Sequence, residues 1–260
     1  MSVKYSDQQI EDFIKNGQVE PYYQPIRKNK EFTSTYKKFE ILARIDISIG
    51  KGELKELSPY FFIKTAKKLG IYHLVTEQII LKSFARIKAL VEKYSSEDFK
   101  FSINIQIEDI KNEKTVQLIK NEIVGLGIEK NIIFELSEED SLTGDNIEKT
   151  KEFMKTFKDL GSEFALDDFG TGYSSFHPLI EFNFDYIKLD QVLIQNIYED
   201  PKKYYLCDML VEFSKRNKLV TIAEYVEDIE HEKALEAIGV EYYQGYKYSK
   251  AIKNIEELIA

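Results

Sequence analysis

The chain has 260 residues, a formal net charge of −9 and an isoelectric point near 5.1. This acidic balance argues against a protein that binds a nucleic acid polymer through a broad basic surface. No segment approaches the roughly 18 apolar residues of a membrane span, and the first residues lack the apolar core of a signal peptide, so we expect a cytoplasmic protein. Cys207 is the only cysteine, which excludes an intramolecular disulfide, and its helical setting is more typical of core packing than of a nucleophile.

No stretch rich in proline, glycine or serine divides the chain, so residues 1–260 are expected to form one domain. The pattern of residues 7–16 predicts a short amphipathic helix within an N-terminal extension, residues 1–20. Residues 22–26 predict a first strand, in which Pro25 is typical of an edge or a strand end. Residues 37–45 predict a stronger strand with Glu40 and Arg44 on one face, because side chains alternate along a strand.

The remainder of the chain alternates between helices and strands. Ser58 and Pro59 are typical of a helix start, and helices are expected over residues 58–70 and 72–94. Further strands are expected at residues 100–105, 131–136, 163–167, 185–190, 219–224 and 241–244, with helices between them. This alternation, with its unusual first strand, predicts an α/β fold of the (β/α)8 barrel type, its barrel covering about residues 21–250.

Five successive predicted strands carry hydrophilic residues at or near their carboxyl ends. These residues are Asn104, Glu135, Asp167 with Asp168, Lys188 with Asp190, and Glu224. An adjacent acidic pair is weak evidence alone, because about eight such pairs are expected by chance at this composition. A barrel, however, brings its strand ends together around one mouth, where active sites lie. The repetition therefore predicts a functional site.

The expected ligand set is rich in oxygen and contains no sulfur or imidazole. Such a set favours Mg²⁺ or Mn²⁺ over zinc. A carboxylate such as Asp167 can bridge two cations, and paired metals stabilise the attacking and leaving oxygens of a phosphoryl displacement. These residues therefore predict phosphodiester hydrolysis with two divalent cations.

The ordered motifs of the chain carry a family resemblance from about residue 22 to residue 250. The segments are YYQPI, FEILAR, SPYFFIKTAKKLG, FSINI, FELSE, FALDDFGTGYSSF, DYIKLD, TIAEYVE and QGYKYSK. They resemble those of the EAL phosphodiesterases of bacterial cyclic di-GMP signalling. The resemblance implies a TIM-like barrel with an antiparallel first strand and hydrolysis of cyclic di-GMP to linear pGpG with two Mg²⁺ or Mn²⁺ ions.

The resemblance also implies roles for individual residues. The expected ligands of one metal are Glu40, Asn104, Glu135 and Asp167, and those of the second are Asp167, Asp168 and Glu224. Lys188 is expected to orient the nucleophilic water, and Glu40 and Glu224 are expected to join it in catalysis. Substrate contacts are expected from Gln24, Arg44, Glu227 and Gln244, although Arg44 could instead pair with a neighbouring acid. Glu138 is expected to brace the loop after the paired aspartates.

Two departures from the family pattern leave an alternative function open. The signature Glu-Ala-Leu stands as Glu40-Ile41-Leu42, and the usual Glu-Gly-Val-Glu as Glu224-Tyr225-Val226-Glu227. Tyr225 adds bulk and restricts the backbone beside an expected ligand. The alternative is a catalytically weak or inactive cyclic di-GMP receptor, against which the retention of every expected carboxylate argues.

The resemblance implies a homodimer that pairs through the face near the loop after the paired aspartates and its following helix, and apolar residues there could serve such a face. They are Phe176, Leu179, Ile180 and Phe182, although burial under neighbouring helices explains them equally well. The resemblance also allows for sensory or signalling domains outside this chain.

Overall fold

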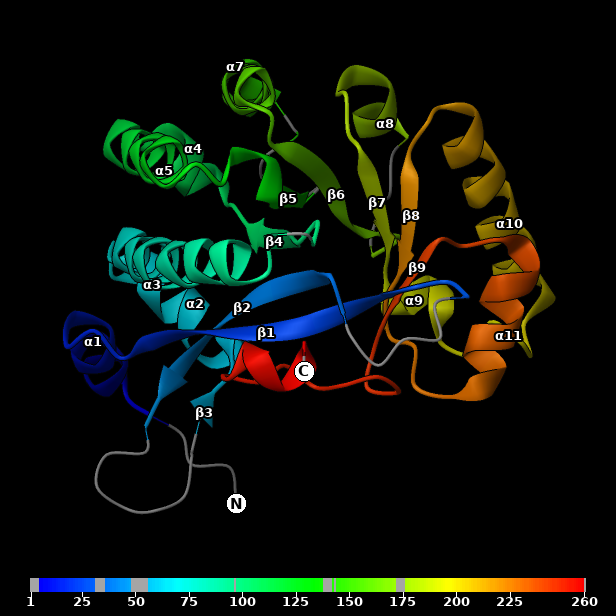
Figure 1. Ribbon diagram of the computed structural model, residues 1–260, viewed down its shortest axis with the longest axis horizontal. Helices are drawn as coiled ribbons and strands as arrows, with labels where there is room; N and C mark the ends of the chain where they lie inside the picture. The colour runs from blue at the N-terminus through cyan, green and yellow to red at the C-terminus, as the bar shows by residue number, and fades with distance from the viewer. Residues whose placement is uncertain are drawn as a thin grey trace.

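The computed structural model describes residues 5–30, 36–47, 56–95, 97–137, 142, 144–171 and 176–259. Within these residues, nine strands form one sheet in the order β1-β9-β8-β7-β6-β5-β4-β2-β3, and a further pairing of β1 with β2 closes eight of them into a barrel. Figure 1 shows helices packed around the outside of this barrel. The predicted (β/α)8 fold class is confirmed.

The strands follow the short apolar runs of the sequence. The barrel contains β1 (Val19–Lys28), β2 (Lys38–Asp46), β4 (Lys100–Asn104), β5 (Ile132–Ser137), β6 (Glu163–Phe169), β7 (Tyr186–Leu189), β8 (Val220–Ala223) and β9 (Tyr242–Gln244). The two-residue strand β3 (Glu56–Leu57) extends the sheet beyond β2. This last strand was not predicted, because two residues carry no periodicity.

The first strand runs against the direction of all the other barrel strands. β1 is antiparallel to both of its neighbours, with Gln24 opposite Glu40 on β2 and Ile26 opposite Gln244 on β9. The pairs from β2 through β4 to β9 are parallel. The expected antiparallel first strand is therefore confirmed.

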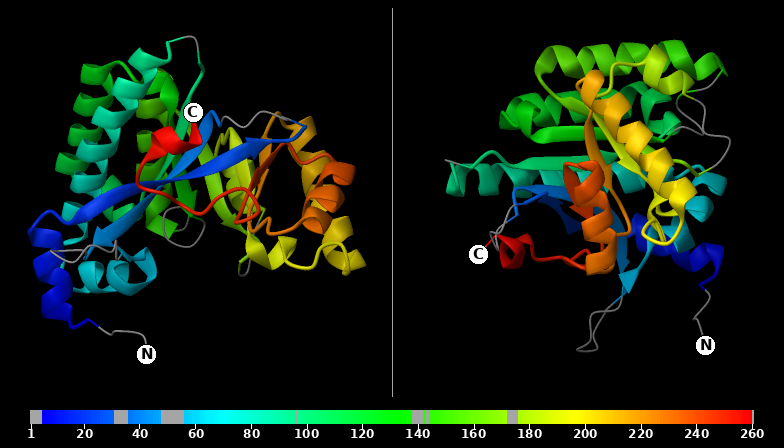
Figure 2. Two further views of the ribbon diagram at one scale, coloured as in Figure 1. Left: turned by 60° about the horizontal axis from the view of Figure 1, so that its bottom comes forward. Right: turned by 90° about the vertical axis from the view of Figure 1, so that its right-hand side faces the viewer.

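The helices cover the outer face of the sheet (Figure 2). They are α1 (Asp7–Lys15), α2 (Pro59–Lys68), α3 (Tyr72–Lys93), α4 (Ile107–Lys111), α5 (Glu113–Leu126), α7 (Ile147–Leu160), α8 (His177–Glu181), α9 (Gln191–Ile194), α10 (Pro201–Arg216) and α11 (Ile229–Ile238). Short 3-10 helices lie at η1 (Glu129–Asn131), η2 (Gly144–Asn146) and η3 (Ile255–Leu258). All of the long predicted helices are present. α8 and α9 have five residues or fewer, which is too short for a helical pattern to be recognised in the sequence.

Strand alternation separates the core from the site. On β5, Phe134 points outward and packs against Phe153 and Phe157 of α7, with ring centroids 5.4 and 4.9 Å away. Its neighbour Glu135 consequently points into the barrel. The same alternation buries apolar residues under the helices and leaves the inner positions for other side chains.

An inner apolar layer lies inside the barrel, formed by Ile26, Ile133, Ala165, Tyr186 and Ile222. On β5 to β8, the residue two positions further along the strand points to the same side. Those residues are Glu135, Asp167, Lys188 and Glu224. The fold therefore places four predicted site residues directly above this layer, toward the carboxyl ends of the strands.

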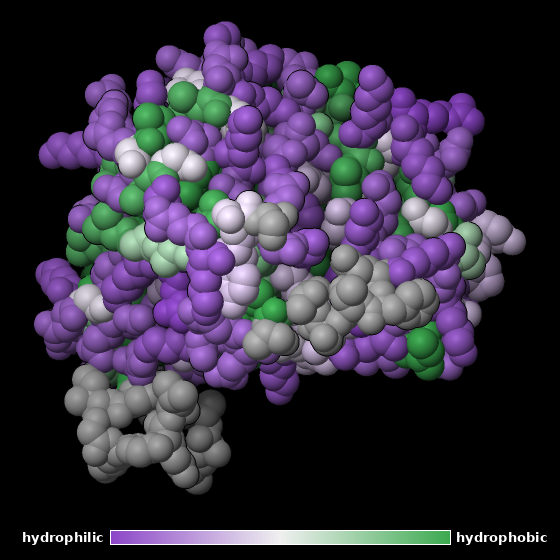
Figure 3. Space-filling view, in the orientation of Figure 1, coloured by the Kyte–Doolittle hydropathy of each residue, from purple (hydrophilic) through white to green (hydrophobic). Residues whose placement is uncertain are grey.

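The face of the molecule seen in the orientation of Figure 1 is mostly polar. Figure 3 shows one face on which hydrophilic residues predominate and hydrophobic ones are scattered. No described helix combines the length and the apolar character needed to cross a membrane.

Candidate active site

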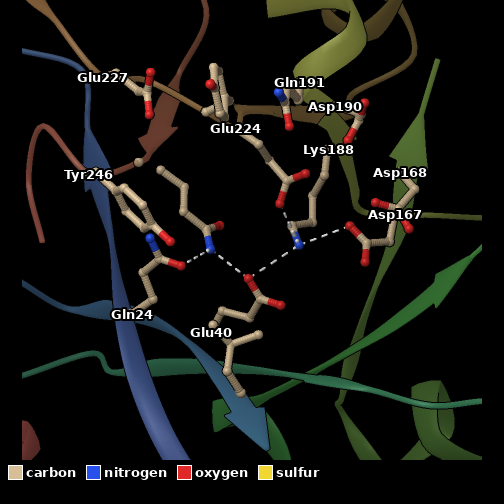
Figure 4. Close-up of a pocket in the computed structure, with 14 residues that line it drawn as sticks. Gln24, Glu40, Asp167, Asp168, Lys188, Asp190, Gln191, Glu224, Glu227 and Tyr246 are labelled. Carbon is tan, nitrogen blue, oxygen red and sulfur yellow. Dashed lines mark hydrogen bonds and ion pairs between the residues drawn. The ribbon is translucent and has the colours of Figure 1, made fainter. Parts of the chain in front are cut away.

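A cavity of about 400 Å³ opens at the carboxyl ends of the barrel strands (Figure 4). It is lined by Gln24, Glu40, Leu42, Asp167, Asp168, Lys188, Asp190, Gln191, Glu224, Tyr225, Glu227, Gln244, Gly245 and Tyr246. Most of the residues predicted for the site therefore meet in one cavity, although they come from distant parts of the sequence.

The Lys188 ammonium lies at the centre of the acidic side chains, and its side chain is only 1% exposed. Its Nζ atom is 2.9 Å from both Glu135 Oε2 and Asp167 Oδ1, 3.0 Å from Glu224 Oε1 and 3.5 Å from Glu40 Oε2. Burial opposes its charge, but the surrounding carboxylates outweigh burial and raise the pKa of Lys188 well above its usual value. Lys188 is therefore a fixed positive charge.

One ammonium does not compensate all of the carboxylates. Burial, together with repulsion from Glu40, raises the pKa of Glu135 well above its usual value, although Lys188 opposes the shift. Burial likewise raises the pKa of Glu224 to about 8, again against Lys188. Burial and the adjacent Asp167 raise the pKa of Asp168 to about 6. Without a further cation, these groups are thus driven toward their protonated forms.

A chain of hydrogen bonds orients Glu40. Gln244 Nε2 donates to Glu40 Oε2 and, at 3.3 Å, to Gln24 Oε1, while Gln24 Nε2 donates to the Ser249 carbonyl at 3.2 Å. Asn104 Nδ2 donates to Glu40 Oε1 at 3.0 Å and lies 3.4 Å from Glu135 Oε2. Asn104 thus turns its amide nitrogen toward the carboxylates, and ligation through its oxygen requires the amide to rotate by about half a turn.

The described acidic groups include one set with the spacing of a metal site. Ligand atoms of Asp167, Asp168 and Glu224 all lie within 4.8 Å of one another. Nearby, Glu135 Oε1 is buried and has no hydrogen-bond partner among the described residues. A buried oxygen without a partner is costly, and a divalent cation would satisfy it.

Among the residues expected to contact the substrate, Arg44 and Glu227 lie away from the central carboxylates. Arg44 does not line the cavity; it donates from Nη1 to the Ala43 carbonyl, lies 3.6 Å from Glu56 Oε1 and stacks near Tyr22. Glu227 lies at the cavity rim. Glu138 falls outside the described residues. The roles of all three stay predictions.

Gln191 and Tyr246 line the cavity but were not assigned to the site from the sequence, whereas Asp190 was noted as a strand-end residue without an assigned role. Asp190 caps α9 by accepting a hydrogen bond from the Val192 backbone at 2.7 Å, and Gln191 follows it. Tyr246 comes two residues after the end of β9. All three lie within two residues of a strand end. Their position after a barrel strand was therefore the sequence signal that could have assigned them to the site.

The segment containing Glu224 passes very close to Gly245. A Cβ atom at Gly245 would lie 2.1 Å from the Val226 oxygen and 2.4 Å from the Val226 nitrogen. Hydrogen bonds from Val226 N to the Gln244 carbonyl and from Lys247 N to the Val226 carbonyl hold the two segments together. Glycine at this position therefore allows Glu224 and Gln244 to share one cavity.

Tyr225 has a left-handed backbone conformation, with φ of 57°. This conformation costs a residue with a side chain about 1–2 kcal/mol, and glycine avoids that cost. The sequence anticipated restricted backbone dihedrals at Tyr225 but could not show that they are left-handed here.

We expect Tyr225→Gly to stabilise the fold modestly. Relief of strain should exceed the extra flexibility that glycine gives the unfolded chain, about 0.4–1 kcal/mol. The net gain in the free energy of unfolding should be about 0.5–1 kcal/mol, measured by urea denaturation. Lys218→Gly is the matched control, because exposed Lys218 has φ of 61° and lies outside the cavity. A loss of stability in Tyr225→Gly beside a gain in Lys218→Gly would contradict the strain argument.

Comparisons with known proteins agree with this geometry. The model of the EAL domain family matches residues 7–251. Among curated relatives, cyclic di-GMP phosphodiesterase PdeB of Shewanella oneidensis is 29% identical over 238 residues, which are 91% of this chain and 27% of that protein. Cyclic di-GMP phosphodiesterase PdeF of Escherichia coli is 30% identical over 224 residues, 84% of this chain and 28% of that protein. The chain thus spans about a quarter of the length of these relatives.

Solved structures share the fold. An EAL domain protein from Listeria monocytogenes superposes with a TM-score of 0.83 at 23% identity, covering 99% of this chain and 97% of that one. The EAL enzyme Bd1971, in a form with cAMP and cyclic di-GMP bound, superposes with a TM-score of 0.82 at 26% identity, covering 97% of this chain and 67% of that one. The match of the family model over most of the sequence shows that this chain belongs to the EAL domain family.

Proposed function

We propose that this chain is a metal-dependent phosphodiesterase that hydrolyses cyclic di-GMP to linear pGpG. One observation carries the proposal: the carboxylates of Glu40, Glu135, Asp167 and Glu224 surround Lys188 beside an open cavity. Relatives that are named cyclic di-GMP phosphodiesterases, and an EAL enzyme solved with cyclic di-GMP bound, support this substrate.

The donor set fits two divalent cations, Mg²⁺ or Mn²⁺. When ionised, the five acidic side chains and Lys188 leave four uncompensated negative charges, the charge that two such ions neutralise. The buried Glu135 Oε1, which has no hydrogen-bond partner among the described residues, would serve as a further oxygen ligand. One ion would be held by Glu40, Asn104, Glu135 and Asp167, and the other by Asp167, Asp168 and Glu224. Bound there, the ions would supply charge neutralisation and a water of lowered pKa.

Side chains of the protein orient the attacking water, stabilise negative charge and contact the substrate. Lys188, held by the carboxylates around it, orients the attacking water and stabilises negative charge on the phosphate. Glu40 and Glu224 fix the geometry around that water. Gln24 and Gln244 orient Glu40 through their hydrogen bonds and face the cavity, where they and Glu227 contact the substrate. Arg44 reaches the substrate only if its contact with Glu56 gives way.

Chromatographic detection of pGpG tests the proposal. Purified protein with cyclic di-GMP should form pGpG with Mg²⁺ or Mn²⁺ and none with EDTA. Glu40→Ala should reduce the rate below detection, whereas Glu77→Ala, an exposed glutamate on α3, should leave it unchanged. Equal rates in the Glu40→Ala variant and the wild type would contradict the proposal.

A second candidate function is a cyclic di-GMP receptor with little turnover. Tyr225, with its strained backbone at the cavity wall, is the observation that favours it. Binding of cyclic di-GMP by calorimetry without pGpG formation would support the receptor, and Tyr225→Gly would then be the first variant to assay.

We also propose a homodimer through the segment that contains α8. Phe176 and Ile180 are 44% and 79% exposed, whereas Phe182 is buried and belongs to the core. The first two residues are therefore the ones available to a second copy. Light scattering should report a dimer, and a monomer at assay concentrations would contradict this.

A further inference from the structure

A second cavity of about 420 Å³ lies at the opposite end of the barrel. It is lined by Ile26, Lys28, Lys37, Lys38, Asp98, Lys100, Glu163, Tyr186 and Tyr242. Lys38, Lys100, Glu163, Tyr186 and Tyr242 are the first residues of their strands. The inner apolar layer, to which Ile26 and Tyr186 belong, separates this cavity from the carboxylates of the candidate active site.

Lys38 is the buried charge among the described residues that line this second cavity. It is 6% exposed, and its Nζ atom donates to Tyr186 Oη at 3.0 Å. The same Nζ lies 4.1 Å from the ring centroid of Tyr186 and 4.8 Å from that of Tyr242. Among the residues that the structure describes, no carboxylate lies within ion-pairing distance of it. Burial accordingly lowers the pKa of Lys38 to about 8.

The hydrogen bonds around Tyr186 leave Lys38 with unused donors. The Tyr186 hydroxyl donates to Glu163 Oε2 at 3.0 Å, so its oxygen accepts from Lys38. The same Glu163 oxygen is 2.7 Å from Lys100 Nζ, so its charge is shared with another lysine. An ammonium has three N–H groups, and the Tyr186 hydroxyl uses one of those on Lys38.

The aromatic rings do not by themselves account for a buried ammonium here. Cation–π contacts contribute up to about 2 kcal/mol at a desolvated site. Removing an ammonium from water costs several kcal/mol. The cavity also contains four lysines and only two acidic residues, in a protein whose net charge is −9. Lys37 and Lys100 are paired with Glu97 and Glu163, so among the described residues Lys28 and Lys38 are the lysines of this lining without an ion-pair partner.

We propose that this cavity binds a small phosphorylated anion, with Lys38 donating to its oxygens. A phosphate group carries the multiple charge that a cluster of ammonium groups attracts, and lysine binds it as a point charge. Lys28, which is exposed at the end of β1, and Lys100 also line the cavity. The cavity volume lies within the range of small-molecule sites, roughly 300–1,000 Å³. This site is separate from the proposed hydrolysis of cyclic di-GMP.

Isothermal titration calorimetry with pyrophosphate tests the site. EDTA is included, so that no divalent ion can attract the probe to the carboxylate-lined cavity. The wild type should bind pyrophosphate, and Lys38→Met should weaken binding at least tenfold. Lys28→Gln should weaken it several-fold. Lys120→Gln, which removes an exposed lysine of α5 outside the cavity, should have no effect.

Absence of binding to the folded wild type, or equal affinity in Lys38→Met, would overturn the proposal. Circular dichroism and thermal unfolding establish that each variant is folded. If Lys38→Met does not fold, Lys28→Gln decides the question, because this exposed residue lies outside the core. A titration with AMP distinguishes the sources of the phosphate: tighter binding than pyrophosphate supports a nucleotide ligand, and weaker binding supports a free phosphate.

Discussion

Lys188→Met is expected to lower kcat for cyclic di-GMP hydrolysis by about 10³-fold, the effect of removing one preorganised donor from an active site. The same change should destabilise the protein in EDTA by about 3–5 kcal/mol, because it leaves buried carboxylates without their ammonium. The distances of 2.9 to 3.5 Å to four carboxylates are the basis for both effects. Steady-state kinetics and thermal unfolding measure them.

A metal titration separates the two effects of Lys188→Met. Mg²⁺ or Mn²⁺ should recover much of the lost stability, since a cation bound to the folded state replaces the missing positive charge. It should not recover kcat, because the donor to the water is still absent. Lys38→Met is the matched control, a buried lysine with no ring of carboxylates around it, and it should lose far less stability. Full activity in Lys188→Met with bound metal would contradict the role given to Lys188.

Gly245→Ala is expected to destabilise the protein by about 3 kcal/mol, the upper range for an overpacked site. The added methyl group would overlap the Val226 backbone, with contacts of 2.1 to 2.6 Å, and backbone cannot turn away as a side chain can. The segment from Glu224 to Glu227 must shift, so activity should fall as well. Urea denaturation and the pGpG assay report the two losses.

Gly125→Ala is the control for the substitution at Gly245. A Cβ atom at Gly125 would meet no heavy atom within 4 Å, and the residue lies inside α5. Alanine should stabilise this helix by about 0.5–1 kcal/mol. Similar free energies of unfolding in the two variants would show that the close approach to Val226 is unimportant.

Most of the fold could be predicted from the sequence, because local patterns of apolar and polar residues mark the strands and the long helices. The run Phe164, Ala165, Leu166 is apolar and ends on Asp167, so both the strand and its polar end could be recognised. The direction of β1 came from the family resemblance, because alternation in a strand is the same in either direction. β3, α8 and α9 are too short for a periodic signal.

The site residues that could be predicted from the sequence are those that lie at the carboxyl ends of strands. Asp167, Lys188 and Glu224 were recognised at or near the carboxyl ends of predicted strands, and in the structure they line one cavity. The direction of the Arg44 side chain depends on Glu56, a tertiary contact that no local pattern contains. The second cavity, at the other end of the barrel, was missed for a similar reason, since Lys38 and Tyr186 are 148 residues apart.

The reversed direction of β1 determines which end of the barrel the first helix touches. In a barrel of parallel strands, the segment before the first strand lies at the end away from the active site. Here Val19 pairs with Ile45 beyond Glu40, so α1 enters from the catalytic end, and Asp7 on α1 pairs with Lys68 on α2. Only a few residues of β1 separate α1 from Gln24. A displacement of the amino-terminal helix along the chain would therefore be carried by β1 to Gln24, whose partner Gln244 orients Glu40.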